Sequence, residues 1–396
     1  MINFALQTTP AAPWPADEHR ETDRPAIALL MPDLPSAQEL LPWLKQIDHN
    51  RWYSNFGPLL QTFESRLTTF LQSRQTSPVH LTTVSTGTAA LELALATLNL
   101  PPGSRVLLPA YTFPATAAAV VKNGLQAVFA DVDEHNWSLT ADIATAALNH
   151  CSFDAVLPVA AFGYPQDASA WDAFHRKTGL PIVVDAASAF SSQKIGCHGI
   201  YAFSLHATKS FGIGEGGLLA CADKTIVERV RRLSNFGFED GVIHQAGQNA
   251  KLSEYHAAVG LAQLERWPLI VKKNRKLAAQ YRRHLQQDKN IVIQGGSGNA
   301  TVSTLPIRLN PPTHVIAEHL REHGIETRRW YSPALDRHPA FAGAECIAQD
   351  GGRELTITRM LEQHVLGLPY HHYLSKQDIK KICNCLHNAL QQHSRK

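Results

Sequence analysis

The chain has 396 residues, of which 44% are hydrophobic and 18% are charged, which is typical of a globular protein and excludes a disordered one. Its formal net charge is +3 with histidine counted as neutral, so the bulk charge indicates neither a nucleic-acid partner nor a membrane-surface partner. Residues 1–25 lack the basic start and apolar middle of a signal peptide, and the sequence has no apolar run of bilayer length, so we expect a cytoplasmic protein without a membrane partner.

The alternation of short apolar runs with helical patterns dominates the chain up to residue 221. We expect strands at 79–84, 105–109, 127–131, 155–160, 181–184 and 218–221. We expect helices at 88–99, 114–123, 140–148 and 168–178. Strands that alternate with helices in this way are typical of an α/β fold, in which helices cover both faces of a mostly parallel sheet.

The pattern changes near Trp267. Before it we expect helices at 224–233 and 253–265; after it, helices at 272–287, 313–323 and 376–391, a strand at 302–308 and a proline-rich loop at 331–341. The predicted organisation is an N-terminal arm (1–28), a large domain (29–266) and a smaller C-terminal α+β domain (267–396).

Cysteine and histidine residues give little sign of a metal site. The six cysteines contain no CxxC pair, which indicates reduced thiols. Cys383 and Cys385 are two apart in an expected helix and point to different faces, so we predict no metal ion there. His371 and His372 have no other ligands nearby in sequence, and we expect them at the surface or at the rim of a site.

Three segments carry candidate chemistry. The sequence STGTAA at 85–90 joins a strand to a helix, and such a helix start is either an ordinary cap or a phosphate site. Asp185 ends a buried apolar strand, where its carboxylate either caps a turn or pairs with a cationic ring nitrogen. Lys209 is framed by hydroxyls, a histidine and a glycine-rich tail, and a lysine in a closed site can form a Schiff base.

The glycines after Lys209 are not a dinucleotide fingerprint. Gly212, Gly214 and Gly217 satisfy GxGxxG, but that motif must follow a strand and open a helix, whereas these glycines precede a strand.

In this order and at these spacings, the three segments resemble the fold-type-I enzymes that use pyridoxal phosphate. More closely, the chain resembles the DegT/DnrJ/EryC1/StrS family of sugar aminotransferases, from about residue 52 to the C-terminus. The resemblance also includes NFGP at 55–58, PAYTF at 109–113 and GQNAKLSE at 247–254, the last of which resembles the family's segment that crosses to the neighbouring subunit.

The resemblance implies roles around the cofactor ring. Lys209 would hold pyridoxal 5'-phosphate (PLP) as a Schiff base and then, once free, would shuttle a proton. Asp185 would keep the pyridine nitrogen protonated, and Phe113 would stack on the ring. Ser188 stands where many relatives carry glutamine or histidine, so the resemblance gives it a weaker contact with the cofactor.

The resemblance also implies how the phosphate is held. Thr88, Ser204 and the amides around Gly87 and Ala89 would bind it. Asn249 would reach the phosphate of the other subunit's cofactor, so the active unit would be a homodimer with shared sites.

The substrate site departs most from the family pattern. Asp336 replaces the histidine of a PLH motif, and Arg329 and Tyr331 stand where relatives line the sugar site. Arg328 or Arg329 would bind a diphosphate or the donor's carboxylate, or else would be a solvated pair. His206 would contact the substrate or the cofactor, or else would be a packed, hydrogen-bonded residue.

The resemblance implies an aminotransferase that moves an amino group from glutamate or glutamine to a keto-sugar, with a nucleotide-linked 4-keto-6-deoxy sugar as the expected acceptor. One alternative is a sugar dehydratase, but there the lysine is replaced by histidine, whereas this chain has Lys209. The other is a PLP-binding regulator without turnover, for which the sequence offers no DNA-binding module.

Overall fold

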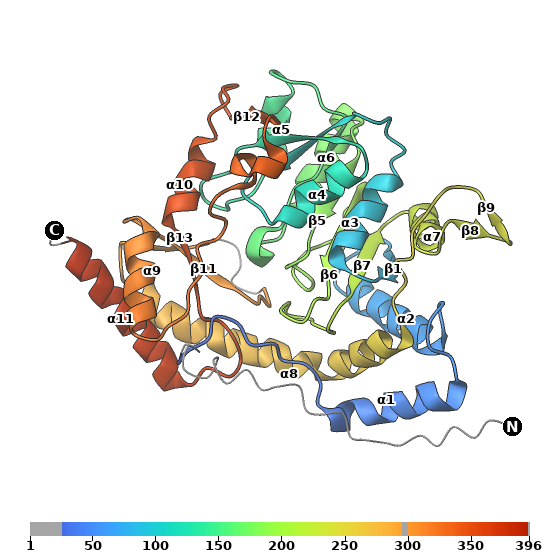
Figure 1. The fold of residues 1–396 in the computed structure, drawn as a ribbon, viewed down its shortest axis with the longest axis horizontal. Coiled ribbons are helices and arrows are strands. Elements are labelled where there is room, and N and C mark those ends of the chain that lie inside the picture. The colour runs from blue at the N-terminus through green and yellow to red at the C-terminus, as the bar shows by residue number, and fades with distance from the viewer. Residues whose placement is uncertain (1–25, 295–299, 395–396) are drawn as a thin grey trace, which may run out of the picture.

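A computed structural model describes residues 26–294 and 300–394. Its larger part is built on an eight-stranded sheet of order β1-β7-β6-β5-β4-β2-β3-β12 (Figure 1). The strands are β1 (His80–Val84), β2 (Arg105–Pro109), β3 (Gln126–Ala130), β4 (Ala155–Val156), β5 (Ile182–Asp185), β6 (Gly199–Ser204), β7 (Gly217–Cys221) and β12 (Glu345–Ile347). Since β7 runs antiparallel to β1 and β6 while the other pairs are parallel, the predicted mostly parallel sheet is confirmed.

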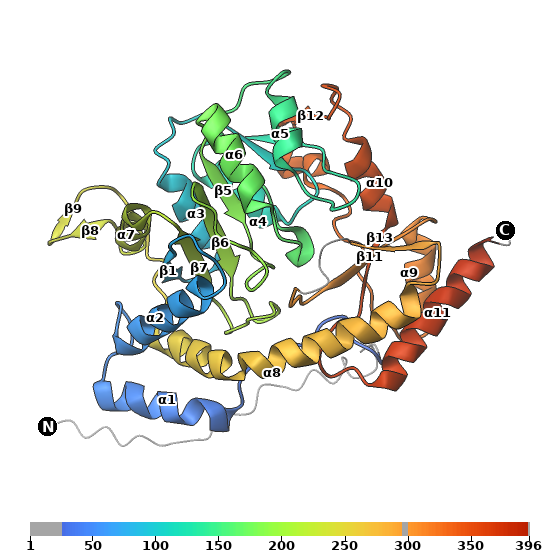
Figure 2. The same cartoon turned by 180° about the vertical axis from the view of Figure 1, so that it is seen from behind.

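Helices cover both faces of this sheet. On one face lie α3 (Gly87–Ala96), α4 (Pro114–Lys122) and α7 (Lys224–Leu233); on the other lie α2 (Pro58–Gln72), α5 (Ala141–Ala147) and α6 (Ala168–Thr178). Figure 1 shows the first face with α3 and α4 in front, and Figure 2 shows α6 in front of the sheet. Successive residues of a strand point to opposite faces of the sheet. In β2, Leu107 packs against the face covered by α2, α5 and α6, whereas Val106 and Leu108 pack against the face covered by α3, α4 and α7.

The smaller part has its own core. Three antiparallel strands, β10 (Ile291–Ile293), β11 (Leu305–Leu309) and β13 (Val365–Leu368), pack against α9 (Thr313–Glu322) and α11 (Lys376–Ser394). Ile27 belongs to this core and pairs with Ile325. The sequence analysis assigned residues up to 28 to an arm and the following residues to the large domain, whereas the chain at Ile27 is buried against the small part. Residues 1–25 of the predicted arm lie outside the described residues.

One helix replaces the two that the sequence predicted on either side of Trp267. Helix α8 (Glu254–Leu285) is continuous over 32 residues and runs beneath both parts of the molecule (Figure 1). Trp267 and Ile270 are buried in the core of the large part, whereas Tyr281 and Leu285 are buried in the core of the small part. The change of pattern therefore marks a change of packing partner within one helix, and Pro268 lies inside it.

In the large sheet, three strand predictions need correction. The strand expected at 155–160 is regular only at Ala155–Val156; Val159 then makes a single bridge to Asp185 before the chain turns into a short 3-10 helix at Ala161–Gly163. No strand was predicted at β6, although its six residues are all buried, nor at the three-residue β12, which is too short to show a period. Through β12, the C-terminal third of the chain joins the edge of the large sheet beside β3.

The remaining elements surround these two cores. They are α1 (Ala37–Asn50), α10 (Thr356–His364) and the hairpin of β8 (Phe238–Glu239) and β9 (Val242–Ile243). Buried Asp131 accepts hydrogen bonds from the amides of Ile357 (2.9 Å) and Thr358 (2.8 Å), so a side chain from the end of β3 caps α10. Across the two described ranges, 26–294 and 300–394, none of the helices has the combination of length and apolar character needed to cross a bilayer.

Candidate active site

The candidate site lies at the carboxyl edge of the large sheet. Asp185 ends β5 and Ser204 ends the neighbouring parallel strand β6. The chain that leaves β1 turns into α3 at the same edge, so that Gly87 packs against Ser204. In open α/β sheets, ligands bind at this edge because strand ends and helix N-termini converge there.

Asp185 is buried, with 4% of its surface exposed, and its carboxylate is held by two hydrogen bonds. Thr116 Oγ1 donates to Oδ2 at 2.8 Å, and the amide of Ala187 donates to Oδ1 at 3.0 Å. Burial raises the pKa of Asp185, while the bonds from Thr116 and Ala187 and the charge of Lys209 act in the opposite direction. The result is a fixed carboxylate that a cation beside it would stabilise further.

Lys209 lies in the loop between β6 and β7, which folds back on itself. The amide of Lys209 donates to the carbonyl oxygen of His206 at 2.8 Å, and the amide of Ala207 donates to that of Gly214 at 2.7 Å. The side chain returns toward the sheet, where Nζ donates to Ser188 Oγ at 3.0 Å. Burial lowers the pKa of Lys209, although the charge of Asp185 opposes the shift, so the amine is closer to its neutral, nucleophilic form than a surface lysine.

The start of α3 offers unpaired backbone amides to a phosphate. Thr86 caps the helix, since its Oγ1 accepts from the amide of Ala89 (3.0 Å) and its carbonyl oxygen accepts from the amide of Ala90 (3.1 Å). The two amides ahead of them, those of Gly87 and Thr88, belong to the group that a helix leaves without an intrahelical partner. The Ala89 amide, predicted to help bind phosphate, already has a partner in the cap.

Gly87 is required by the close approach of β6. A Cβ atom at this position would lie 2.7 Å from the Cβ of Ser204, closer than real side chains come. The absence of a side chain therefore lets the helix start and the Ser204 hydroxyl share one cradle.

Phe113 and Tyr331 are the aromatic residues predicted for this site. Phe113, at the N-cap of α4, is 57% exposed although it is a large apolar residue. Tyr331 stacks on Phe162 with 5.3 Å between ring centroids and meets Tyr111 edge-on at 5.4 Å. Burial, and then the charge of Asp185, raise the pKa of Tyr331, which places its hydroxyl in the electrostatic environment of Asp185.

Two of the predicted residues, Arg329 and Asn249, make their described contacts elsewhere, whereas the amide of His206 donates to Ser204 Oγ at 3.3 Å. His206 Nδ1 lies 2.9 Å from Thr208 Oγ1, and its Nε2 lies 3.6 Å from a Glu215 oxygen. Exposed Arg329 donates to Ser332 Oγ at 3.2 Å. Exposed Asn249 accepts a 2.8 Å hydrogen bond from Lys251 Nζ. Within one chain, the structure brings Asp185, Ser188 and Lys209 together, and it brings Gly87 to Ser204.

A pocket opens beside Lys209 at the junction of the large and small parts. Its wall includes residues from the N-terminal segment, the Lys209 loop, α8 and the small part: Met31, Asp33, Lys209, Asn274, Ser303 and His372. His372 Nδ1 lies 2.8 Å from Asp33 Oδ2. That bond, with Arg266 and Lys273, holds the pKa of Asp33 well below its usual range.

Of the two positions predicted for His371, surface or rim, the structure favours the rim, because His371 lines the pocket beside Lys209 together with His372. Its side chain is buried, and a ring nitrogen donates to the carbonyl oxygen of Ala28 at 3.1 Å. No local pattern predicts this contact, because its two residues are 343 positions apart.

A sequence model of the DegT/DnrJ/EryC1/StrS aminotransferase family matches residues 36–387. The chain belongs to this family. It is 30% identical, over 374 residues, to the dTDP-4-amino-4,6-dideoxy-D-glucose transaminase of Shigella dysenteriae, an alignment that covers 91% of this chain and 98% of that enzyme.

Two solved structures are similar over nearly their whole length. DesI, crystallised with its TDP-sugar product, has a TM-score of 0.82 and 28% identity, covering 94% of this chain and 96% of that one. The aminotransferase TlmJ from Streptoalloteichus hindustanus has a TM-score of 0.80 and 26% identity, covering 92% and 99%. The chain is accordingly a PLP-dependent aminotransferase with the type I fold.

The site of this aminotransferase fits PLP. A carboxylate fixed by two hydrogen bonds suits a protonated ring nitrogen, and a lysine with a lowered pKa suits the aldehyde. The cradle between Gly87 and Ser204, which a Cβ atom would fill, suits the phosphate.

Sequence reasoning missed two residues of the enzyme's site. Thr116 holds the Asp185 carboxylate from the first turn of α4, and its only signal was its position three residues after Phe113. Asp33 lines the pocket beside Lys209 although the two residues are far apart in sequence. Only the packing of the N-terminal segment reveals it.

Proposed function

We propose that this aminotransferase moves the amino group of glutamate or glutamine to a keto-sugar carried on a nucleotide, with a 4-keto-6-deoxy sugar as the acceptor. The observation that carries the proposal is the Lys209 amine, which has a lowered pKa, bonds to Ser188 and lines a pocket between the two parts of the chain. The names of the Shigella enzyme and of the DesI product support the class of acceptor. Six free cysteines support a location in the reducing cytoplasm.

We assign the reaction chemistry to Lys209 and Asp185. Bound PLP would withdraw electrons from the carbon that carries the transferred amine. The Asp185 carboxylate would favour a proton on a ring nitrogen placed beside it, because the negative charge stabilises the protonated form. The Lys209 amine would take a proton from the substrate carbon at Nζ and release it again, as general acid–base catalysis requires. Ser188 orients Nζ through the 3.0 Å hydrogen bond.

The remaining contacts position the ligands. Phe113 is exposed, so its ring is available to stack on a flat group. The amides of Gly87 and Thr88, with Ser204, are placed to hold a phosphate. Tyr331 stacks on Phe162 within the electrostatic environment of Asp185.

Two further side chains remain candidates for the substrate. Exposed Arg329 is available to the anionic groups of either substrate. His206 lies in the same loop as Lys209, and its carbonyl oxygen accepts a hydrogen bond from the Lys209 amide.

The second subunit completes the site in this proposal. Asn249 is exposed, and it follows the β8–β9 hairpin, which projects from the body of the chain (Figure 1). The hairpin region exposes large apolar side chains that a partner chain would bury: Phe236, Phe238, Val242 and Ile243. We infer a homodimer in which Asn249 serves the cofactor phosphate of the neighbouring subunit.

The proposed reaction is tested with the purified enzyme and PLP. L-glutamate or L-glutamine is expected to replace the visible absorbance of the lysine-bound cofactor with the near-ultraviolet absorbance of its amine form. Subsequent addition of a dTDP-4-keto-6-deoxy sugar should restore the visible band and yield an amino sugar, detected by mass spectrometry. A band that ignores both donors would point to a regulator or another donor. Release of ammonia without an amino sugar would indicate a dehydratase.

The shared site is tested by mixing inactive variants. Lys209→Ala and Asn249→Ala chains, refolded together, form hybrid dimers in which one of the two sites has both residues intact. Half of the dimers are hybrids, so about a quarter of wild-type activity is expected. Each variant refolded alone is the control. If the mixture is no more active than the Asn249→Ala variant alone, Asn249 does not act across subunits.

A further inference from the structure

Two histidines and a cysteine meet in the small part, away from the Lys209 pocket. His319 lies on α9, His323 directly follows α9, and Cys385 lies on α11. One ligand atom from each side chain lies within 4.8 Å of the others. Helices α9 and α11 run side by side near the C-terminus (Figures 1 and 2). Neither helix contributes a residue to the wall of the Lys209 pocket.

The two histidines are arranged as metal ligands are. They are four positions apart, and their ring centroids lie 4.4 Å from each other. His323 Nδ1 lies 2.8 Å from the carbonyl oxygen of His319, which accepts its proton. That bond fixes the tautomer and leaves the Nε2 lone pair free. Metal-binding histidines usually donate their other ring nitrogen to a carbonyl or carboxylate in this way.

Cys385 supplies a buried sulfur on the opposite helix. Its surface is 6% exposed. A divalent metal ion bound there would bind the thiolate, and the thiol proton would be released to solvent. The charge of the ion would compensate that of the thiolate, so burying the thiolate would cost less free energy than burying it unpaired.

The cluster borders a hollow on the surface. Cys385 and His323 line it together with Gln377, Asn384 and Asn388, and with Lys380 and Lys381. A ligand set of two imidazoles and one thiolate leaves one position of a tetrahedral ion unfilled. The hollow gives that position access to water or to a small anion, which the two lysines favour.

We propose that His319, His323 and Cys385 bind a zinc-class divalent ion that links α9 to α11. In tetrahedral zinc sites, metal–ligand bonds of about 2.0–2.3 Å place the ligand atoms roughly 3.3–3.8 Å apart. The side chains reach this spacing from 4.8 Å by small rotations. In the sequence, Cys385 was compared only with its neighbour Cys383, whereas the fold sets Cys385 beside histidines about 60 positions away.

The test uses the full-length, tag-free holoenzyme, free of excess PLP and titrated with zinc chloride in a calorimeter. Wild type is expected to bind one zinc ion per chain and to melt at a higher temperature with zinc than with EDTA. His323→Ala and Cys385→Ala are each expected to raise the zinc Kd by at least about 10-fold. The cobalt complex should show a thiolate-to-metal absorbance band that disappears in Cys385→Ala.

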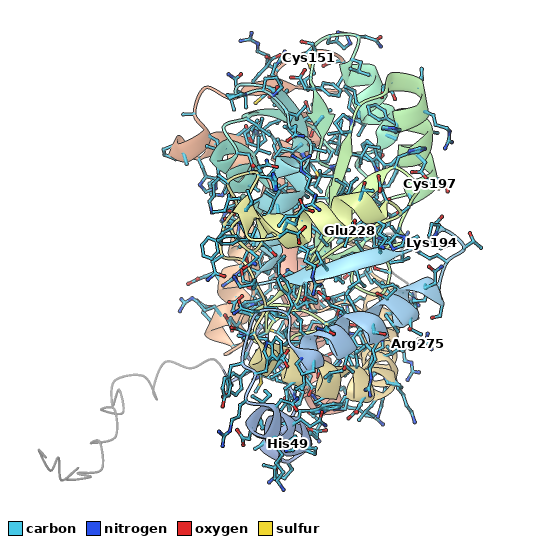
Figure 3. All side chains as sticks on the ribbon, turned by 90° about the vertical axis from the view of Figure 1, so that its right-hand side faces the viewer. His49, Cys151, Lys194, Cys197, Glu228 and Arg275 are labelled. Atoms are coloured by element: carbon cyan, nitrogen blue, oxygen red, sulfur yellow. The ribbon has the colours of Figure 1, made fainter. Side chains whose placement is uncertain are left out.

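Matched controls separate this site from general affinity for zinc. His314→Ala removes an exposed histidine from the same helix, and Cys197→Ala removes an exposed thiol, labelled in Figure 3; both should bind zinc as wild type does. Equal melting temperatures of His323→Ala and wild type in EDTA would show that the variant is folded. Unsaturable zinc binding by wild type, or an unchanged Kd in folded His323→Ala, would overturn the proposal.

Discussion

Replacing Lys209 with alanine is expected to lower kcat by about 10⁴-fold or more, because the variant loses both its covalent attachment point and its proton shuttle. The protein should remain folded. The lysine ammonium is disfavoured by its surroundings, as its lowered pKa indicates, and its one described hydrogen bond is to Ser188. Alanine therefore removes chemistry at little cost in stability.

Two measurements check this expectation. The visible absorbance of the PLP-loaded variant should lack the lysine-bound band, and the rate of the first half-reaction with glutamate should fall with kcat. Lys194→Ala is the control, because Lys194 is exposed on the surface (Figure 3). Retention of the band in Lys209→Ala, or an equal loss of rate in Lys194→Ala, would contradict the assignment of Lys209.

The sequence predicted the large sheet well for a physical reason. Its strands are buried on both faces and its helices are amphipathic, so each element carries a local pattern of its own. Helix 168–178 and strand 105–109 were predicted with the bounds that the structure has. The pattern failed where one element serves two cores, as α8 does at Trp267, and where a strand has only three residues, as β12 does. No strand was predicted at β6 either, although all six of its residues are buried.

The site could be predicted only in part. Asp185 at the end of a predicted strand and Lys209 before a glycine-rich turn carry local signals, whereas Ser204 was assigned only from the family resemblance, since its strand β6 was not predicted. Thr116 and Asp185 are 69 positions apart, and His372 and Asp33 are 339 positions apart. A local sequence pattern cannot predict contacts between residues so far apart. The cysteine–histidine cluster on α9 and α11 was overlooked for the same reason.

Asparagine in place of Asp185 is expected to lower the rate of the first half-reaction by about 10²–10³-fold, the usual cost of removing one preorganised electrostatic group. The amide keeps the size of the carboxylate but not its charge, so it cannot hold a proton on a neighbouring ring nitrogen. Thr116→Val removes only one hydrogen bond to the carboxylate and should cost about 10-fold. Single-turnover kinetics with glutamate measures both, and a rate for Asp185→Asn within a factor of two of wild type would contradict the role of Asp185.

The same substitution should act in the opposite direction on the stability of the cofactor-free protein. Because burial raises the pKa of Asp185 in the fold, the native state binds more protons than the unfolded state between the two pKa values. Wild-type stability therefore falls as pH rises from about 4, the unfolded value, through the raised folded value. Asp185→Asn lacks this loss, so at pH 7 it should need more urea to unfold than cofactor-free wild type. Lower stability of the variant at pH 7 would show that the hydrogen bonds from Thr116 and Ala187 outweigh the burial of the charge. The carboxylate would then be held ready for the cofactor without a stability cost.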